Sequence, residues 1–358
     1  MEQFPPAEPK KRNWLGLVSA IMAVVLILIL LLYFLPSLPL GNFFSPHEST
    51  STFIQNPSGN LISTNSSSAS NVDITYPSNY AALENYTLSI IDQNRTSSGL
   101  NPVTSSSIPS GQQHADSMLQ NNYFSHWDTQ GFKPYMRYSL LNGTGFVEEN
   151  VAYEFSSFPT FTSIRSVESV IGDLEWQMMN NDSVCCANGH RDNILNQYHD
   201  RVSIGIAYSA YAVYFVEDFE TYLVNFITPI TQGSTVVLEG NASQAIDPTS
   251  VEVFYDQPPA PLTSADLNAN YSTPYGEGTF LGGVIPPCNA LFQRCSEFRQ
   301  GVTVEASAWQ AGGSGINIKF SLDKFVQSSG NGVYTVYLTQ GDQNNPEYLT
   351  SISIFVSS

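Results

Sequence analysis

An uncharged stretch near the N-terminus constrains this chain more than any other feature. It runs from Trp14 to Leu40, and its most apolar part is Leu15–Phe34. A helix of about 20 apolar residues spans the hydrocarbon core of a bilayer. A cleaved signal peptide has a shorter apolar region and a small-residue cleavage site, which the following sequence lacks. We therefore predict a transmembrane anchor over residues 14–36.

A basic cluster sets the expected orientation of this anchor. Lys10, Lys11 and Arg12 directly precede the apolar stretch, and basic residues flanking a span stay on the cytoplasmic side. Residues 1–13 are then a cytoplasmic tail, and everything after Pro36 lies outside the cytoplasm. The predicted location is the cell membrane, with a single span and extracytoplasmic domains.

Two further patterns fit an exterior protein. Glycosylation sequons, N-x-[ST], occur seven times, although a chain rich in Asn, Ser and Thr also contains such triplets by chance. They begin at Asn65, Asn85, Asn94, Asn142, Asn181, Asn241 and Asn270. The sequence has 31 acidic and 13 basic residues, for a net charge of −18. That charge repels phosphate backbones and argues against nucleic acid as a partner.

The four cysteines fall into two groups. Cys288 and Cys295 flank a short loop and could close a disulfide in an oxidising compartment. Cys185 and Cys186 are adjacent, so three states stay open for them: a vicinal disulfide, pairing with other cysteines, or free thiols. Neither group has the spacing of a zinc ribbon.

The remainder of the chain divides into three segments by composition and periodicity. Residues 37–78 are rich in Ser, Thr, Asn and Pro and have few large apolar residues, which predicts a disordered stalk. Residues 79–228 combine helical spacing, clearest over 166–179, with period-two runs after His199, which predicts a mixed α and β domain. The apolar face of the 166–179 helix should be buried and Trp176 should point away from it.

Residues 229–358 show short alternating apolar runs separated by Gly and Pro, which predicts an all-β domain. The segment NGVYTVYL, residues 331–338, is similar to the F strand of immunoglobulin-like domains, with Tyr334 as the tyrosine corner. Val336 stands where an antibody-type domain has a cysteine. The expected fold class is therefore α+β, with a mixed domain followed by an immunoglobulin-like β-sandwich.

Four segments within residues 80–226 together resemble the CAP superfamily in its prokaryotic SCP-like branch, the group of cysteine-rich secretory proteins, antigen 5 and pathogenesis-related 1 proteins. In chain order they are HADSMLQNNYFSHWDTQG, VEENVAY, NGHRDNILN, and VSIGIAY followed by YFVEDF. The resemblance implies an α-β-α sandwich with a cleft that holds two histidines and two glutamates.

The resemblance matches three positions of that cleft, and these are our candidate catalytic and metal-binding residues: His126, Glu149 and His190. Two neutral imidazoles and a carboxylate can hold a divalent ion such as zinc and leave a position for water. The same groups can also hydrogen-bond one another without a metal. His114 is expected to be a packing or surface histidine.

The sequence departs from the family pattern at two positions. Glu148 replaces the usual glycine before the glutamate, and Met179 stands where the second glutamate is expected. Glu175 is the nearest carboxylate to Met179, about one helical turn away. A missing second carboxylate weakens the case for acid/base catalysis.

Two functions follow from these expectations. One is a membrane-anchored, extracytoplasmic binding or structural module for an envelope or surface protein, a glycan or a lipid. The alternative is a metal-dependent, peptidase-like hydrolase that uses the cleft of His126, His190 and Glu149. Whether the protein is an enzyme stays open at this point, because a fold does not fix a function.

Overall fold

The computed structural model describes residues 53–55, 61–63, 80–226, 230–232, 234–271, 274–288, 298–342 and 345–357. The predicted tail and anchor, residues 1–36, lie outside this part of the chain, and so does the predicted stalk apart from the short strands β1 (Phe53–Gln55) and β2 (Leu61–Ser63). Among the described helices, none has the length and apolarity needed to cross a bilayer. The anchor over residues 14–36 therefore stays a prediction.

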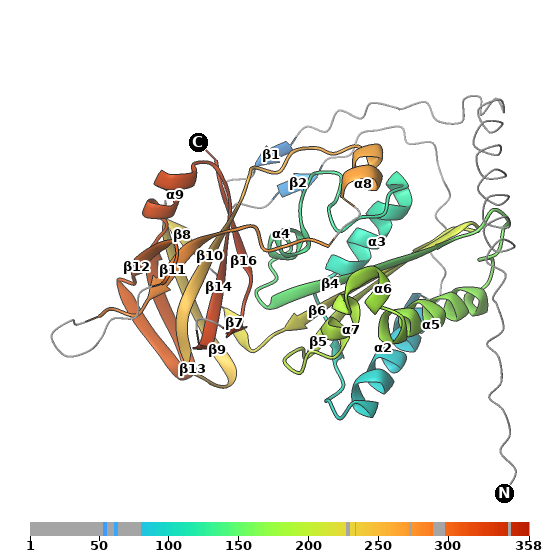
Figure 1. Ribbon diagram of the computed structural model, residues 1–358, viewed down its shortest axis with the longest axis horizontal. Helices are drawn as coiled ribbons and strands as arrows, with labels where there is room; N and C mark the ends of the chain where they lie inside the picture. Colours follow the sequence, from blue (N-terminus) through green and yellow to red (C-terminus); the bar gives the residue numbers. More distant parts are fainter. Residues whose placement is uncertain are drawn as a thin grey trace, which may run out of the picture. The chain divides into compact units, whose positions relative to one another are not determined.

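The described residues from Tyr80 onward belong to one compact unit, and its first part is built on a four-stranded sheet (Figure 1). The strand order is β3-β5-β6-β4, with β6 antiparallel to both β4 and β5, and β3 parallel to β5. The strands are β3 (Thr104–Ser105), β4 (Phe146–Phe155), β5 (Arg201–Tyr208) and β6 (Ala212–Thr221). This order leaves β4 at one edge of the sheet.

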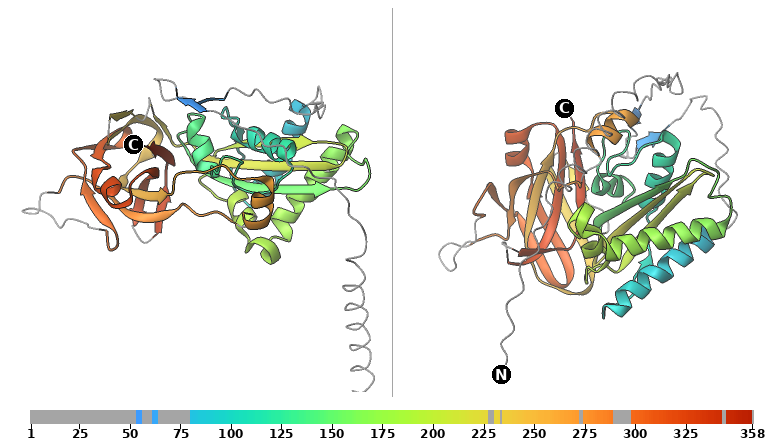
Figure 2. Two further views of the ribbon diagram at one scale, coloured as in Figure 1. Left: turned by 90° about the horizontal axis from the view of Figure 1, so that it is seen from above. Right: turned by 45° about the vertical axis from the view of Figure 1, so that its right-hand side comes forward.

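Helices cover both faces of this sheet (Figures 1 and 2). One face packs against α2 (Tyr80–Ser97), α5 (Ile164–Asn180) and α7 (Gly189–Ile194), and the other against α3 (Ser110–Asn121). Because side chains alternate along a strand, Phe215 of β6 joins the first core and Val216 joins the second. The short helices α4 (Pro134–Leu140) and α6 (Ser183–Cys186) complete this part. The expected α-β-α layering is present.

Helix α5 shows how local sequence sets this arrangement. Ser163 and Ser166 form a capping box at its start, which satisfies backbone N–H groups that have no partner within the helix. Its buried residues follow helical spacing and include Val167 and Ile171, as predicted. Trp176 points away from this core and is 60% exposed.

The second part consists of two sheets that share one hydrophobic core, with residues such as Leu238 and Phe320 from one sheet and Val253 and Val336 from the other. One sheet contains β7 (Val224–Phe226), β8 (Ile230–Gln232), β9 (Thr235–Ile246) and β13 (Ala308–Ser321). The other contains β10 (Pro248–Asp256), β11 (Thr279–Ile285), β12 (Val302–Glu305), β14 (Gly332–Asp342), β15 (Asn345–Tyr348) and β16 (Ile352–Val356). Among the described residues of this part, the predicted all-β character holds apart from α8 (Ser264–Asn270) and α9 (Asp323–Ser329).

Tyr334 behaves as a tyrosine corner. Its hydroxyl donates to the carbonyl oxygen of Gly330 at 2.5 Å, so it bonds the backbone a few residues upstream as such a tyrosine does. Whether the two sheets follow immunoglobulin topology stays a prediction.

The all-β part holds the mixed part through directed polar contacts. Asp256 of β10 accepts hydrogen bonds from Lys133 Nζ at 2.7 Å and Tyr135 Oη at 2.6 Å. Near the chain end, Ser351 donates through its backbone N–H to the carbonyl of Gly145 at 3.0 Å. These contacts fix the start of β4 against the second part.

Candidate functional site

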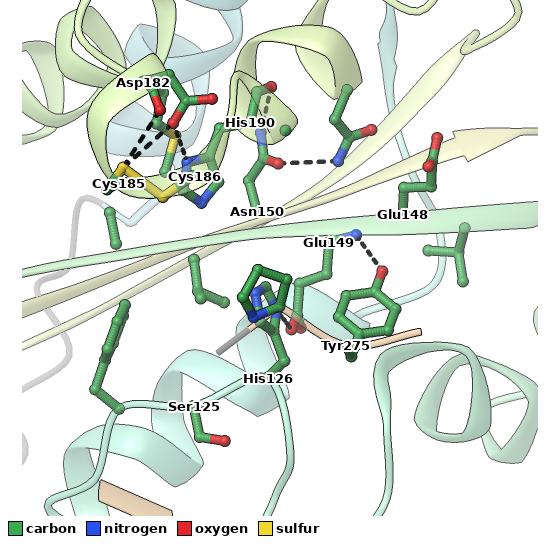
Figure 3. Close-up of a pocket in the computed structure, with 18 of the residues that line it drawn as sticks. Ser125, His126, Glu148, Glu149, Asn150, Asp182, Cys185, Cys186, His190 and Tyr275 are labelled. Atoms are coloured by element: carbon green, nitrogen blue, oxygen red, sulfur yellow. Dashed lines mark hydrogen bonds and ion pairs between the residues drawn. A yellow bond between two sulfur atoms is a disulfide. The ribbon is translucent and has the colours of Figure 1, made fainter. Parts of the chain in front are cut away.

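A pocket of about 590 Å³ follows β4 along the edge of the sheet. Its walls come from β4 itself, the region from the end of α5 to α7, residues 124–126 after α3, Tyr135 of α4, and the all-β part around Tyr275 (Figure 3). His126, Glu149 and His190 all line this pocket, so the three predicted site residues share one hollow.

The backbone of β4 forms part of the pocket wall. Of the described strands, only β6 pairs with β4, so alternate backbone groups of β4 point away from the sheet. Two of these outward N–H groups have partners: Val147 donates to Ser351 Oγ at 3.2 Å, and Glu149 donates to Tyr275 Oη at 2.9 Å. By the same alternation Val151 and Tyr153 direct their N–H groups outward, and neither has a partner among the described residues.

Glu149 is the centre of a buried polar cluster below β4. One carboxylate oxygen lies 2.9 Å from His126 Nδ1, and the other lies 2.7 Å from His114 Nδ1 and 2.6 Å from Arg137 Nη2. Burial by itself raises the pKa of Glu149, but the charge of Arg137 and the hydrogen bonds with His114 and His126 outweigh it and hold the pKa well below its ordinary value. Glu149 is therefore a carboxylate at neutral pH.

His114 belongs to the site, which differs from its predicted role as a packing or surface histidine. Burial and the nearby Arg137 lower its pKa, so the ring is neutral. Arg137 Nη2 lies 2.9 Å from the same Nδ1 that faces Glu149, and the shorter contacts favour Nδ1–H donating to the carboxylate. His114 Nε2 then has no partner among the described residues.

His190 lies in a second cluster, above β4 (Figure 3). Its Nδ1 is 2.6 Å from Asp182 Oδ1, and its backbone carbonyl accepts from Asn150 Nδ2 at 3.2 Å. Because Glu149 and Asn150 are consecutive on β4, their side chains leave the strand on opposite sides. The structure thus divides the predicted trio into two histidine–carboxylate pairs, His126 with Glu149 and His190 with Asp182.

The sequence left the second glutamate of the family pattern without a clear counterpart, and neither candidate position supplies one. Neither Met179 nor Glu175 lines the pocket. Glu175 is buried on the α2 side of the sheet, where its Oε1 accepts from Asn94 Nδ2 at 2.8 Å. Glu148 is part of β4 and faces His199, 3.2 Å from its Nε2.

The two histidine–carboxylate pairs determine which of the predicted zinc ligands have a free ligand atom. Both oxygens of Glu149 are already occupied by His126, His114 and Arg137, so Glu149 suits an orienting role better than a ligand role. Each histidine in a pair keeps its Nε2 for a ligand, and metal-binding histidines commonly bond a carboxylate through the other ring nitrogen. His126 and His190 therefore each keep one ring nitrogen that has the chemistry of a metal ligand, from opposite sides of β4.

A separate group that can hold a metal ion lies on the α6–α7 wall. It consists of Asp182, Cys185, Cys186 and His190, whose candidate ligand atoms all lie within 4.8 Å of one another. Cys185 and Cys186 form a disulfide with each other, one of the three states left open by the sequence. Cys288 is also disulfide-bonded, and its predicted partner, Cys295, lies outside the described residues.

The sequence analysis did not identify three residues that contact the candidate site residues: Arg137, Tyr275 and Asp182. Asp182 offered a signal, because it precedes the cysteine pair and lies eight residues before His190. Tyr275 offered none, since it reaches Glu149 from 126 residues further along the chain.

No family model and no curated protein matches this sequence. The solved structures that are similar to part of this chain include the following two. One is an extracellular protein containing an SCP domain from Bacillus anthracis, at 19% identity and a TM-score of 0.29, over 39% of this chain and 40% of that protein. The other is an outer surface protein from Borrelia burgdorferi, at 14% identity and a TM-score of 0.30, over 39% of this chain and 92% of that one. Membership of the CAP superfamily stays a prediction from the sequence motifs.

Proposed function

We propose that this chain is a membrane-anchored, extracytoplasmic binding module whose pocket takes an extended peptide segment along the edge of β4. The observation that carries the proposal is the pocket that follows β4, where Val151 and Tyr153 direct outward backbone N–H groups for which no described residue is a partner. An extended peptide adds to such an edge through backbone hydrogen bonds, while neighbouring pockets select its alternate side chains.

The side chains around this edge suit that mode of binding. Tyr153 is 48% exposed and its ring lies 4.5 Å from that of Phe124, which also lines the pocket. An aromatic pair of this kind offers an apolar surface for one side chain of the ligand. His126 and His190 stand on the two sides of the strand and can contact side chains that alternate in direction.

Methylation of peptide backbones tests this mode of binding directly. Fluorescein-labelled hexapeptides would be screened against the full chain in detergent by fluorescence polarisation, and the tightest binder would then be N-methylated one residue at a time. Since a hydrogen bond contributes about 1 kcal/mol, methylation should weaken binding about fivefold at every second residue and little between. Equal losses at all positions, or no binding by any peptide, would contradict the proposal.

A variant pair tests the same contact from the protein side. Val151→Pro removes one outward N–H at an edge strand, where proline is tolerated, whereas Val151→Ala keeps it. Peptide affinity should fall for Val151→Pro and stay within about twofold for Val151→Ala. Equal affinity for both variants would show that the edge does not bind the peptide.

The proposed membrane anchor is inferred from the apolar stretch of residues 14–36. A chain lacking residues 1–36 should leave the membrane pellet and appear in the supernatant after ultracentrifugation. A truncated chain that still pellets with membranes, and is released only by detergent, would refute the anchor.

The metal-dependent hydrolase stays a second candidate, favoured by the two histidine–carboxylate pairs that face one pocket. In this mechanism, His126 and His190 would be the residues that hold a divalent ion, and the ion would lower the pKa of a water molecule. Glu149 and Asp182 orient the two rings. Peptide hydrolysis that depends on added Zn²⁺ and is lost in a His126→Ala, His190→Ala double variant would support this candidate. Peptide binding without turnover would leave the binding module.

A further inference from the structure

The α6–α7 wall of the pocket brings two cysteines, a histidine and a carboxylate into one small volume. Cys185 Sγ lies 3.6 Å from Asp182 Oδ1, and His190 Nδ1 lies 2.6 Å from the same oxygen. This group lies outside the His126–Glu149 cluster and depends on none of its side chains (Figure 3).

The backbone between the two helices holds this group together. Ala187 and Asn188 both have positive φ, 52° and 72°. A residue other than glycine in this region costs about 1–2 kcal/mol, so two in succession are kept by the surrounding structure. They reverse the chain between Cys186 and His190, and Asp182 Oδ2 accepts from the backbone N–H of Arg191 at 3.2 Å.

The oxidised and reduced forms of this group differ in what they can bind. The sulfur atoms of a disulfide are uncharged, whereas the thiolate is the form of cysteine that binds metals. On reduction the group offers two sulfur ligands, an imidazole and a carboxylate. Four ligands of these types suit a tetrahedral d¹⁰ ion, and the two thiolates favour a soft one.

We propose that reduction of the Cys185–Cys186 disulfide creates a site for one thiophilic divalent ion, Zn²⁺ or Cd²⁺, held by Cys185, Cys186, His190 and Asp182. A dithiol reductant passes two electrons and two protons to the disulfide, which becomes two thiols, and the reductant becomes a disulfide. Binding of the ion then releases one proton from each thiol. Ion uptake in this wall of the pocket is therefore controlled by the redox state of adjacent cysteines.

Cadmium titration of the full chain in detergent tests the proposal. The background is a Cys288→Ser, Cys295→Ser variant, which removes the other disulfide, and reduction with a phosphine is followed by anaerobic gel filtration. The reduced protein should bind one Cd²⁺ per chain, with the ultraviolet charge-transfer band of thiolate–cadmium bonds. The oxidised protein should show neither.

Variants of the group separate this site from adventitious binding. Adding Cys185→Ser and Cys186→Ser should abolish the band, and His190→Gln or Asp182→Asn should weaken binding at least about tenfold. Asp192→Asn, which removes the same charge from an exposed position on α7, should leave the affinity unchanged.

Three results would overturn the proposal. The first is a reduced protein that keeps its far-ultraviolet circular dichroism but binds no Cd²⁺. The second is binding that survives the loss of both cysteines or equals that of the oxidised protein. The third is unfolding on reduction in the Cys288→Ser, Cys295→Ser background, because the site would then not exist in the native fold.

Discussion

Glu149 and Asp218 lie directly opposite each other on β4 and β6, and their carboxyl groups have opposite pKa shifts. Glu149 has Arg137 and two histidines around it and stays ionised. Burial, and next the negative charge of Glu149, raise the pKa of Asp218 well above its ordinary value. Only one of these two carboxyl groups therefore carries a charge. Because Arg137 contacts Glu149, the charge is on Glu149 and Asp218 stays protonated.

Removal of Arg137 should strongly destabilise the fold. Arg137→Met leaves the buried Glu149 carboxylate without its guanidinium, and breaking a buried ion pair costs about 3–5 kcal/mol. Urea unfolding followed by circular dichroism gives the free energy of unfolding. Adding Glu149→Gln should recover part of the loss, and a double variant as unstable as the sum of the two single variants would contradict the coupling.

The buried Glu220 should make stability depend on pH in a defined window. Burial raises its pKa to about 6, and a raised carboxyl pKa means that the native state favours the protonated form. Its contribution is complete below the unfolded pKa of about 4.5 and is lost as the pH rises through 6. The difference corresponds to about 2 kcal/mol.

The variant Glu220→Gln isolates this effect, because the amide oxygen can still accept from Tyr138 Oη. From pH 4.5 to pH 7.5, unfolding free energies should fall by about 1.5 kcal/mol more in the wild type than in the variant. Parallel pH profiles for the two proteins would show that Glu220 does not titrate in this window.

The close packing of α3 against β5 predicts that substitution by alanine affects stability differently at two glycines. A Cβ at Gly205 would lie 2.1 Å from the carbonyl oxygen of Gly111, so Gly205→Ala should cost about 3 kcal/mol of stability through overpacking. A Cβ at Gly189 in α7 would have nothing within 4 Å, and Gly189→Ala should be neutral or stabilising by up to about 1 kcal/mol. Thermal unfolding of both variants checks this, and equal melting temperatures would contradict it.

Asp256 contacts the mixed part, so removal of its carboxylate should measurably lower the free energy of unfolding. Asp256→Ala removes the carboxylate that accepts from Lys133 Nζ and Tyr135 Oη and leaves both donors only the carbonyl of Gly276, which should cost about 1–2 kcal/mol. Glu305→Ala, at an exposed position on β12, should change stability by less than about 0.5 kcal/mol. Chemical denaturation of the two variants should separate them, and similar unfolding midpoints would show that this contact contributes little.

The sequence was sufficient for features that depend on local periodicity. Helix α5, with its buried face through Val167 and Ile171 and with Trp176 outside, follows from residue spacing alone. The pairing of His126 with Glu149 was within reach because the family motifs marked both positions.

Features that depend on contacts between distant segments could not be predicted. Tyr275 meets Glu149 only because the all-β part folds back onto β4. The separation of His190 from Glu149 comes from the direction in which consecutive β4 side chains leave the strand, and no motif had identified β4 as an edge strand. The burial of the Glu175 carboxyl group could not be predicted either, because its hydrogen-bond partner, the side-chain amide of Asn94, comes from a different helix.

The walls of the pocket come from both parts of the chain, with Tyr275 and Tyr337 contributed by the all-β part. This shared construction limits how such a protein can diversify. If recombination joined the mixed part to an unrelated neighbour, the backbone N–H of Glu149 would lose its acceptor, the Tyr275 hydroxyl, and the pocket would lose one wall. Inheritance of this pocket therefore requires both parts to pass together.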